Sequence, residues 1–437
     1  MIQFKRYRQI PVQISILITL FLSFAWIRWS HPPAPFTANY VMGFVISRAM
    51  LVTIILWMVF GFYGLSDFIK SKWRLLWAAS LLVLLGWMTI SQTWAFGLED
   101  YSGLAPNAVL QFALVTLFAI TVACASPPPR VIVSGLIISL VLHGIIGNLQ
   151  VMRQSSIGLT AWGEIVLDPN KSGISVIQSG AVRWLRPYGL LPHPNIYAGV
   201  ITVSLLSSII WVLSDHKKRW IGMGVFGFGF WILLLTFSRG AWVGFAAGAL
   251  FALPFMMRRA NFWKRILPII GLSVLVGIVF IAMFRPLLLS RVGVGEEGIE
   301  LRSISDRLVY NQIARQAIIE YPFHGIGAGN FPWYASVYIF YNTDYDLRGD
   351  NVHNIYLGIL SELGVIGFSL FTLTFSSPII AALKQRDTER IALLAGVIAF
   401  AVIGLVDHYP MTLIHTQALW FSLLSVAISP QVTNSQA

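Results

Sequence analysis

The sequence predicts an all-α, polytopic membrane protein with about 12 transmembrane helices and two long external loops, the second of which is partly helical. Three observations lead to this fold class. Of the 437 residues, 57% are hydrophobic and only 11% are charged. The mean hydropathy is +0.73. Apolar runs of about 17–20 residues recur along the chain, and their continuous rather than alternating pattern indicates helices that cross a bilayer.

The apolar runs divide the chain into successive segments. We expect spans at residues 11–27, 40–65, 75–92, 108–126, 131–150, 194–213, 220–237, 241–257, 266–284, 353–381, 391–406 and 412–429. Residues 1–150 then hold helices 1–5, 151–193 an external loop, 194–284 helices 6–9, 285–352 the long external loop, 353–430 helices 10–12, and 431–437 a tail. The first run is similar to a secretory signal but lacks a convincing cleavage site, so we expect it to be retained.

Charge placement predicts the orientation of these spans. With the N-terminus in the cytoplasm, the inner connections carry 17 basic residues and the short outer connections carry two, Arg28 and Arg239. The inner residues are Lys5, Arg6, Arg8, Lys70, Lys72, Arg74, Arg130, Lys217, Lys218, Arg219, Arg258, Arg259, Lys264, Arg265, Lys384, Arg386 and Arg390. The positive-inside rule therefore places both termini in the cytoplasm and both long loops outside. The net charge of +12 is a topology signal that faces membrane lipids, which argues against a nucleic-acid partner.

The second external loop contains a predicted helix. Residues 305–321 have helical character, with Ser303 or Ser305 as the N-cap and Pro322 after the end. Arg307 shares one face of this helix with residues four and eight positions later. A glycine-rich turn at 325–329 follows, and we interpret it as a hinge because it lacks the Lys-Ser/Thr of a phosphate-binding loop.

His353 lies where this polar loop meets the next apolar run, with Asp350 and Asn351 as available N-caps of the helix that follows. Its position offers a group that titrates near neutral pH at the membrane surface. A histidine at such an interface can also have no role, so the residue alone does not assign one.

Arginines near the outer ends of spans are candidate anion ligands. Arg239 lies in a short turn between two spans, where it either binds lipid headgroups or joins the amides of the next helix in holding a phosphate. Arg183 and Arg186 precede a stiff segment that contains Pro187 and Pro194, and we expect Arg186 to be an anion ligand.

Charged residues inside spans need partners. Arg48 lies about eight residues into the second span, and Glu362 lies within the tenth. An isolated arginine in hydrocarbon costs roughly 2.5–3.5 kcal/mol, so Arg48 should face a cavity or a counter-charge. A structural ion pair and a supporting role in a site are both open for these residues.

The sequence contains no motif that clearly predicts a metal site. Asp344-Tyr345-Asp346 has the spacing of a metal–nucleotide site, but it falls in an external loop, where we interpret it as solvated. The histidines at 193, 324, 408 and 415 lack the spacing of metal-ligand pairs. We therefore expect no metal and no cofactor.

Four motifs occur in order between residues 186 and 367. They are Arg186-Pro187-Tyr188-Gly189 with Pro194-Asn195, then Ser238-Arg239-Gly240, then the Pro/Gly turn from Tyr321 to Phe331, and finally His353-Asn354 followed by Gly364 and Gly367. In these motifs the chain resembles the O-antigen ligase/polymerase superfamily of bacterial membrane glycosyltransferases. The first half resembles that family only in hydropathy.

The resemblance implies a metal-independent, inverting enzyme of the bacterial inner membrane. Its donor would be a glycan on undecaprenyl diphosphate, and its acceptor a hydroxyl of a glycan, lipid or protein. The essential histidine of the family corresponds to His353, and its arginines correspond to Arg186 and Arg239. We expect His353 to be the general base and the arginines to hold the diphosphate. Arg307 is a further candidate donor ligand, and Arg48, Asn354 and Asp350 are possible supporting residues.

Two alternatives remain at this stage. Ligation and polymerisation of polysaccharide differ only in the acceptor, which the sequence does not identify. A transporter of bicarbonate or another inorganic anion is the alternative from a different class. A transporter would carry its key charges near the midplane on broken helices, whereas most candidates here lie at the outer edge.

Overall fold

The computed structural model describes residues 2–26, 44–96, 104–180, 182–213, 216–259, 261–291, 298–342 and 349–429. The predicted tail at 431–437 and the Asp344-Tyr345-Asp346 motif lie outside the described residues.

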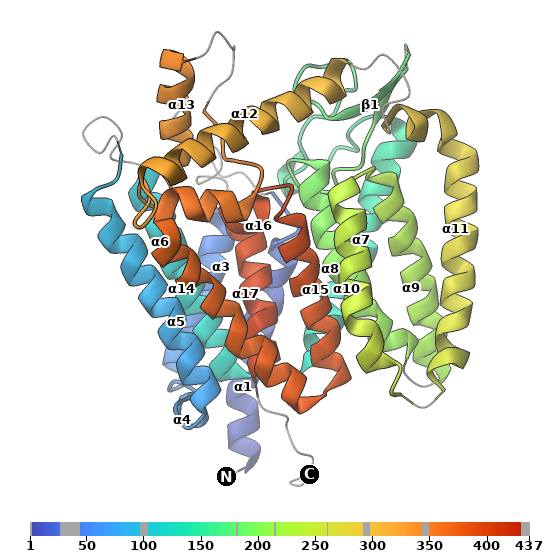
Figure 1. Ribbon diagram of the computed structural model, residues 1–437. Coiled ribbons are helices and arrows are strands. Elements are labelled where there is room, and N and C mark those ends of the chain that lie inside the picture. Colours follow the sequence, from blue (N-terminus) through green and yellow to red (C-terminus); the bar gives the residue numbers. More distant parts are fainter. Residues whose placement is uncertain are drawn as a thin grey trace.

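Long helices form one bundle (Figure 1). They are α1 (Ile2–Leu22), α3 (Phe44–Val59), α5 (Lys72–Ile90), α6 (Leu104–Ala125), α7 (Pro129–Arg153), α8 (Pro194–Val212), α9 (His216–Leu235), α10 (Arg239–Met256), α11 (Phe262–Arg291), α14 (Ile355–Gln385), α15 (Thr388–Ile403) and α17 (Ile414–Ile428). Shorter pieces are α4 (Leu65–Ile69), η1 (Ser91–Thr93), η2 (Thr160–Trp162) and α16 (Tyr409–Thr412).

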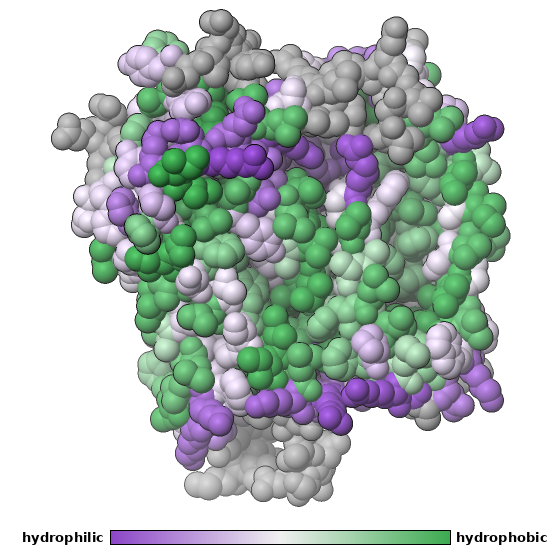
Figure 2. Space-filling model, viewed as in Figure 1, coloured by the Kyte–Doolittle hydropathy of each residue, from purple (hydrophilic) through white to green (hydrophobic). Residues whose placement is uncertain are grey.

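A helix occupies each of the expected apolar runs. Among the described residues, eight helices are long and apolar enough to cross a membrane by length and composition, and three more apolar helices are shorter. The total of 12 spans therefore stays a prediction. The face shown in Figure 2 agrees with a membrane-embedded bundle, because a broad apolar band on it separates two hydrophilic edges.

One end of the bundle, here called the loop end, carries α12 (Gly298–Glu320), α13 (Phe331–Asn342) and the strands β1 (Val176–Ser179) and β2 (Val182–Leu185). The helix α12 lies across this end, opposite to the start of α1 (Figure 1). The strands pair antiparallel, with Val176 opposite Leu185. This hairpin departs from the all-α prediction, and it forms where β-branched and aromatic residues flank Gly180, which has a φ of 57°.

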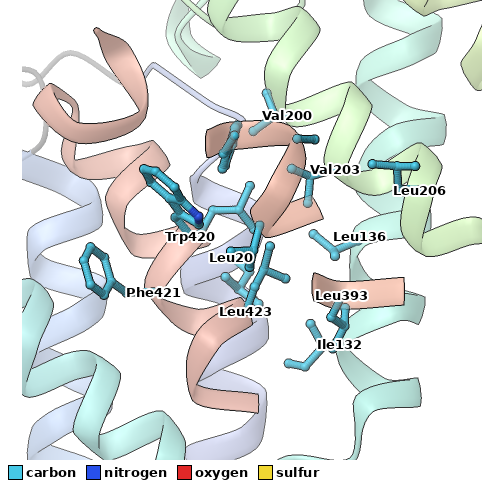
Figure 3. Packing of buried hydrophobic residues seen from close by; sticks show 14 of the residues in the cluster. Leu20, Ile132, Leu136, Val200, Val203, Leu206, Leu393, Trp420, Phe421 and Leu423 are labelled. Atoms are coloured by element: carbon cyan, nitrogen blue, oxygen red, sulfur yellow. The ribbon is translucent and has the colours of Figure 1, made fainter. Parts of the chain in front are cut away.

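The hydrophobic core lies where five helices meet. Leu20 of α1, Leu136 of α7, Val203 of α8, Leu393 of α15 and Trp420 of α17 pack together (Figure 3). Because α8 and α17 are buried along almost their whole length, they form the centre of the bundle. In a bilayer this arrangement leaves the outer helices to face lipid.

Small residues bring α10 and α15 into close contact. A Cβ atom added at Gly248 would lie 2.5 Å from the carbonyl oxygen of Ala395, and one added at Gly244 would lie 2.9 Å from that of Ala399. Spacing of four residues on both helices is the small-xxx-small pattern that lets helix backbones approach in membranes. This contact fixes the start of α10 relative to the segment that follows α15.

A glycine kink in α14 anchors the segment between α12 and α13. Gly364 has a φ of 65°, and a Cβ atom there would lie 2.2 Å from the backbone of Phe323. The carboxylate of Glu362 accepts hydrogen bonds from the N–H groups of Gly329 at 3.0 Å and Phe331 at 3.1 Å. The turn at 325–329, predicted as a hinge, is therefore held to α14, and these amides are the partners that Glu362 needs.

Two predicted helix starts are wrong. The loop helix begins at Gly298 and runs through Ser303 and Ser305, because the preceding residues are good helix formers without proline. The N-cap of α14 is Asn354, whose Oδ1 accepts from the N–H groups of Tyr356 and Leu357. The helix thus starts after His353, and neither Asp350 nor Asn351 caps it.

Candidate active site

A cavity of about 900 Å³ lies at the loop end, and we call it the polar cavity. The residues predicted from the sequence that line it are Arg186, Arg239, Arg307, Asp350 and His353, and Arg183 lines it as well. They come from β2 and the segment after it, from the starts of α10 and α14, and from α12. The fold therefore gathers His353 and these four arginines around one space.

Arg186 is buried, with 3% of its surface exposed. Its Nε donates to the carbonyl of Thr236 at 2.6 Å, and its two Nη atoms donate to Oγ of Ser175 at 2.9 Å and to Oδ1 of Asn195 at 2.7 Å. A guanidinium has five N–H donors in a fixed planar fork, so one arginine can hold several acceptors at once. Arg186 also ties together the turn before Arg239, the loop before β1 and the start of α8.

Arg239 is the first residue of α10, and its side chain is exposed. Ser238 at the N-cap makes no side-chain capping bond, and Ser238, Gly240 and Ala241 all line the polar cavity. The first N–H groups of a helix carry partial positive charge and attract anions. The start of α10 therefore offers both a guanidinium and backbone donors to a phosphate group.

His353 is half-buried just before α14, and its Nδ1 has no hydrogen-bond partner among the described residues. Its ring lies 5.0 Å from that of His408, at 85°. Burial and the nearby charges of His408 and Arg307 lower the pKa of His353 to about 4, against the opposing effect of Asp407. The imidazole is thus neutral at pH 7 and able to accept a proton. The expectation of a pKa near neutrality is corrected, because it ignored burial and neighbouring cations.

Asp407 and His408, between α15 and α16, line the same cavity and were not predicted as site residues. The carboxylate of Asp407 accepts from the Nδ2 of Asn195 at 3.1 Å and from the backbone N–H of His408 at 3.0 Å. Burial alone would raise the pKa of Asp407, but the charges of His408, His353 and Arg307 outweigh it and lower that pKa. Asp407 therefore supplies negative charge beside the histidines.

His193 also lines the polar cavity and was not predicted as a site residue. Its Nδ1 accepts from the backbone N–H of Asn195 at 3.1 Å, which caps α8. Burial, followed by the charge of Arg186, lowers the pKa of His193 to about 3. The ring is therefore neutral, and in this structure it serves as the N-cap of α8.

Ligand-type atoms of His353, Asp407 and His408 lie within 4.8 Å of one another, a grouping that some metal ions use. Both carboxylate oxygens of Asp407 already accept hydrogen bonds, and Arg307 adds positive charge nearby. A metal cation is disfavoured beside the positive charge of Arg307. The set is better suited to holding and passing a proton.

The remaining predicted residues lie elsewhere. Arg48 is exposed on α3 and does not line the polar cavity. Asn354 faces a smaller cavity of about 100 Å³, where His408 forms part of the wall shared with the polar cavity. Asn354 caps α14 and its Nδ2 donates to the carbonyl of Leu405 at 3.1 Å. It therefore fixes the segment that carries His353.

A sequence signal for the missed residues does exist. Asp407 and His408 interrupt an apolar stretch between two predicted spans, at the end that the charge bias makes external. Adjacent ionisable residues at such a position indicate function more often than a lone surface charge does. Asn195 was part of the first of the four motifs, but nothing in the sequence gave it a role in the site.

Comparison with known proteins identifies a family domain in the second half of the chain. The family model described as O-Antigen ligase matches residues 224–372, from α9 into α14. The match includes Arg239, Arg307 and His353, whereas Arg186 and Asp407 lie outside it. No match to a curated protein was found. The match confirms the resemblance seen in the motifs: over residues 224–372 the chain is similar to the O-antigen ligase family.

Proposed function

We propose that this protein is a metal-independent, inverting glycosyltransferase. It moves an oligosaccharide or polysaccharide from undecaprenyl diphosphate to an acceptor hydroxyl on the external face of the bacterial inner membrane. The family match supports the general class, a membrane glycosyltransferase of the O-antigen ligase or polymerase type. The reaction and its location are the finer part of the proposal.

The observation that best supports this proposal is that one histidine and three arginines predicted from the sequence line the same polar cavity. Arg186, Arg239 and Arg307 bring three guanidinium groups to the space that His353 also faces. A diphosphate carries several negative charges, and arginines neutralise phosphate oxygens bidentately. A neutral histidine beside them is the group that a sugar hydroxyl needs as a base.

The transfer involves one bond formed and one bond broken. The acceptor oxygen attacks the anomeric carbon from the face opposite to the diphosphate, while the proton of that hydroxyl passes to His353. The bond from the anomeric carbon to the phosphate oxygen breaks, and its electron pair leaves with the diphosphate. Negative charge then grows on the leaving group, and Arg239 and Arg307 stabilise it. The product has the inverted anomeric configuration.

The loop end is the external side in this proposal. The predicted charge bias places the basic connections in the cytoplasm, and the polar cavity lies at the opposite end, under α12. A donor lipid in the outer leaflet would reach the cavity with its diphosphate at the membrane surface. The apolar band below it would accommodate the polyprenyl chain.

Reconstituted transfer tests the proposal. Purified protein in liposomes is incubated with an undecaprenyl-diphosphate-linked glycan and, in separate reactions, with a lipid glycan, a protein or a second lipid-linked glycan as acceptor. We expect a product with one acceptor, at an unchanged rate in EDTA. The acceptor that grows distinguishes ligation from polymerisation. Absence of any product with all acceptors, or a strict need for a divalent ion, would contradict the proposal.

The pH dependence of transfer should reflect the environment of His353. A lowered pKa keeps the imidazole neutral to lower pH, so kcat/KM should stay level through pH 6.5 and fall only as the pH approaches 4. Initial rates at subsaturating donor across this range measure the effect, with return to pH 7 as a check on reversible acid damage. An acid limb at or above 6.5 would show that burial and the neighbouring charges do not lower the pKa of the group that accepts the proton.

A further inference from the structure

A line of hydrogen bonds connects the buried arginine to the carboxylate beside the histidines. Arg186 donates to Oδ1 of Asn195 at 2.7 Å, and Nδ2 of Asn195 donates to Oδ2 of Asp407 at 3.1 Å. Asp407 in turn accepts from the backbone of His408, whose ring contacts that of His353. Asn195 thus stands between the part of the site that attracts anions and the part that accepts a proton.

An amide is well suited to this position. The amide oxygen accepts from a cation and the amide NH₂ group donates to an anion; an ionised carboxylate can only accept, and a hydroxyl would have to do both through a single oxygen atom. Arg186 and Asp407 are both buried, with 3% and 9% of their surfaces exposed. Buried charges need hydrogen-bonding partners, and the amide serves both at once.

The backbone holds Asn195 rigidly. It is the second residue of α8, after Pro194, and its own N–H is bonded to His193. Because α8 is among the most buried helices of the bundle, its first turn has little freedom to move. The side chain therefore presents its two ends in fixed directions.

We propose that Asn195 is a positioning residue that couples the diphosphate subsite to the proton-accepting histidines. Its oxygen holds Arg186 where the leaving diphosphate is bound, and its NH₂ group holds Asp407 beside His353 and His408. The inference rests on the proposed function, because it assigns the two ends of the network to the two halves of that reaction.

Two substitutions separate the two ends of the amide. Asn195→Ala removes both hydrogen bonds, so kcat should fall and KM for the donor should rise, each by roughly 10-fold or more, the loss expected for one bond to a charged group. Asn195→Asp keeps an acceptor for Arg186 but loses the donor to Asp407. At pH 8 it should leave KM within about threefold of wild type while kcat falls roughly 10- to 100-fold.

A double substitution tests the coupling directly. In the Asp407→Asn background, the further change Asn195→Asp leaves one amide facing one carboxylate, so a hydrogen bond between the two side chains can form with the roles of donor and acceptor exchanged. It should therefore cost less than about threefold in kcat, far less than in the wild-type background. Equal costs in the two backgrounds would show that Asn195 and Asp407 act independently, and would overturn the inference.

Asn148→Ala is the matched control. Asn148 lies on α7, accepts a hydrogen bond from Nε1 of Trp231 at 3.2 Å, and lines neither cavity. It should leave kcat and KM unchanged. The folded fraction of each variant is measured by size-exclusion chromatography, and rates are expressed per folded protein. If Asn195→Asp lowered only the folded fraction, with kcat unchanged, Asn195 would be merely structural.

Binding of undecaprenyl diphosphate separates this inference from the proposed function. If wild-type protein transfers no glycan, the proposed function fails, but binding still reports on the arginine end of the network. Asn195→Ala should then weaken binding of undecaprenyl diphosphate roughly 10-fold, and Asn195→Asp should retain it. Unchanged binding by Asn195→Ala would overturn the inference whatever the transfer assay shows.

Discussion

Replacement of His353 by alanine is expected to reduce glycan transfer by roughly 100- to 10,000-fold, the contribution of a positioned general base. The protein should remain folded, because the buried Nδ1 of His353 makes no hydrogen bond within the described residues. Transfer from an undecaprenyl-diphosphate-linked glycan by purified protein measures the effect. Donor binding should change much less than the rate, since the arginines stay in place.

The control for His353 is His324→Ala. His324 is exposed in the turn after α12 and bonds the carbonyl of Gly325 at 2.8 Å. It lines neither cavity, so its removal should leave transfer at the wild-type rate. Transfer by the His353 variant at the rate of this control would remove the general-base role and leave the arginines as a binding site alone.

Replacement of Arg239 by lysine is expected to lower kcat/KM for the donor by roughly 10- to 100-fold. The charge is kept, but an ammonium cannot place two N–H donors on two phosphate oxygens as a guanidinium does. The effect should be larger on kcat than on binding of the donor, because the charge on the leaving group is greatest in the transition state. Steady-state kinetics at varied donor concentration separate the two.

Arg258→Lys provides the comparison at the opposite end of α10. Arg258 follows the other end of α10, where its guanidinium lies 5.8 Å from the centre of the Phe255 ring. The same change of side chain there should leave transfer unaltered. Equal kinetics for the Arg239 and Arg258 variants would mean that Arg239 serves only to bind headgroups at the bilayer edge.

Short sequence patterns predicted the features of this structure that depend on residues close together in the chain. Continuous apolar runs marked the helices, and the arginines stood out because charge is costly near a bilayer. Arg186, Arg239, Arg307 and His353 were expected to gather around one space, and they line one cavity. What each of them does there stays a prediction.

The parts that the sequence did not reveal depend on contacts between distant residues. Asn195 and Asp407 are 212 positions apart, and only the packing of α8 against α15 brings them together. The pKa of His353 was misjudged for the same reason, since burial and His408 act on it through space. The start of α12 was missed because good helix formers precede the serines that were expected to cap it, and the start of α14 was missed because Asp350, Asn351 and Asn354 are all residue types that cap helices.

The contact between Gly248 of α10 and Ala395 of α15 bears on the transporter alternative. A rocking mechanism needs one group of helices to slide or tilt against another. Sliding by a single residue here would press a side chain against a facing carbonyl, so we expect these two helices to move together. Arg239 begins α10 and Asp407 follows the end of α15, so we expect their separation to change little if other helices move. Such close packing favours an active site of fixed geometry over the moving gate of a transporter.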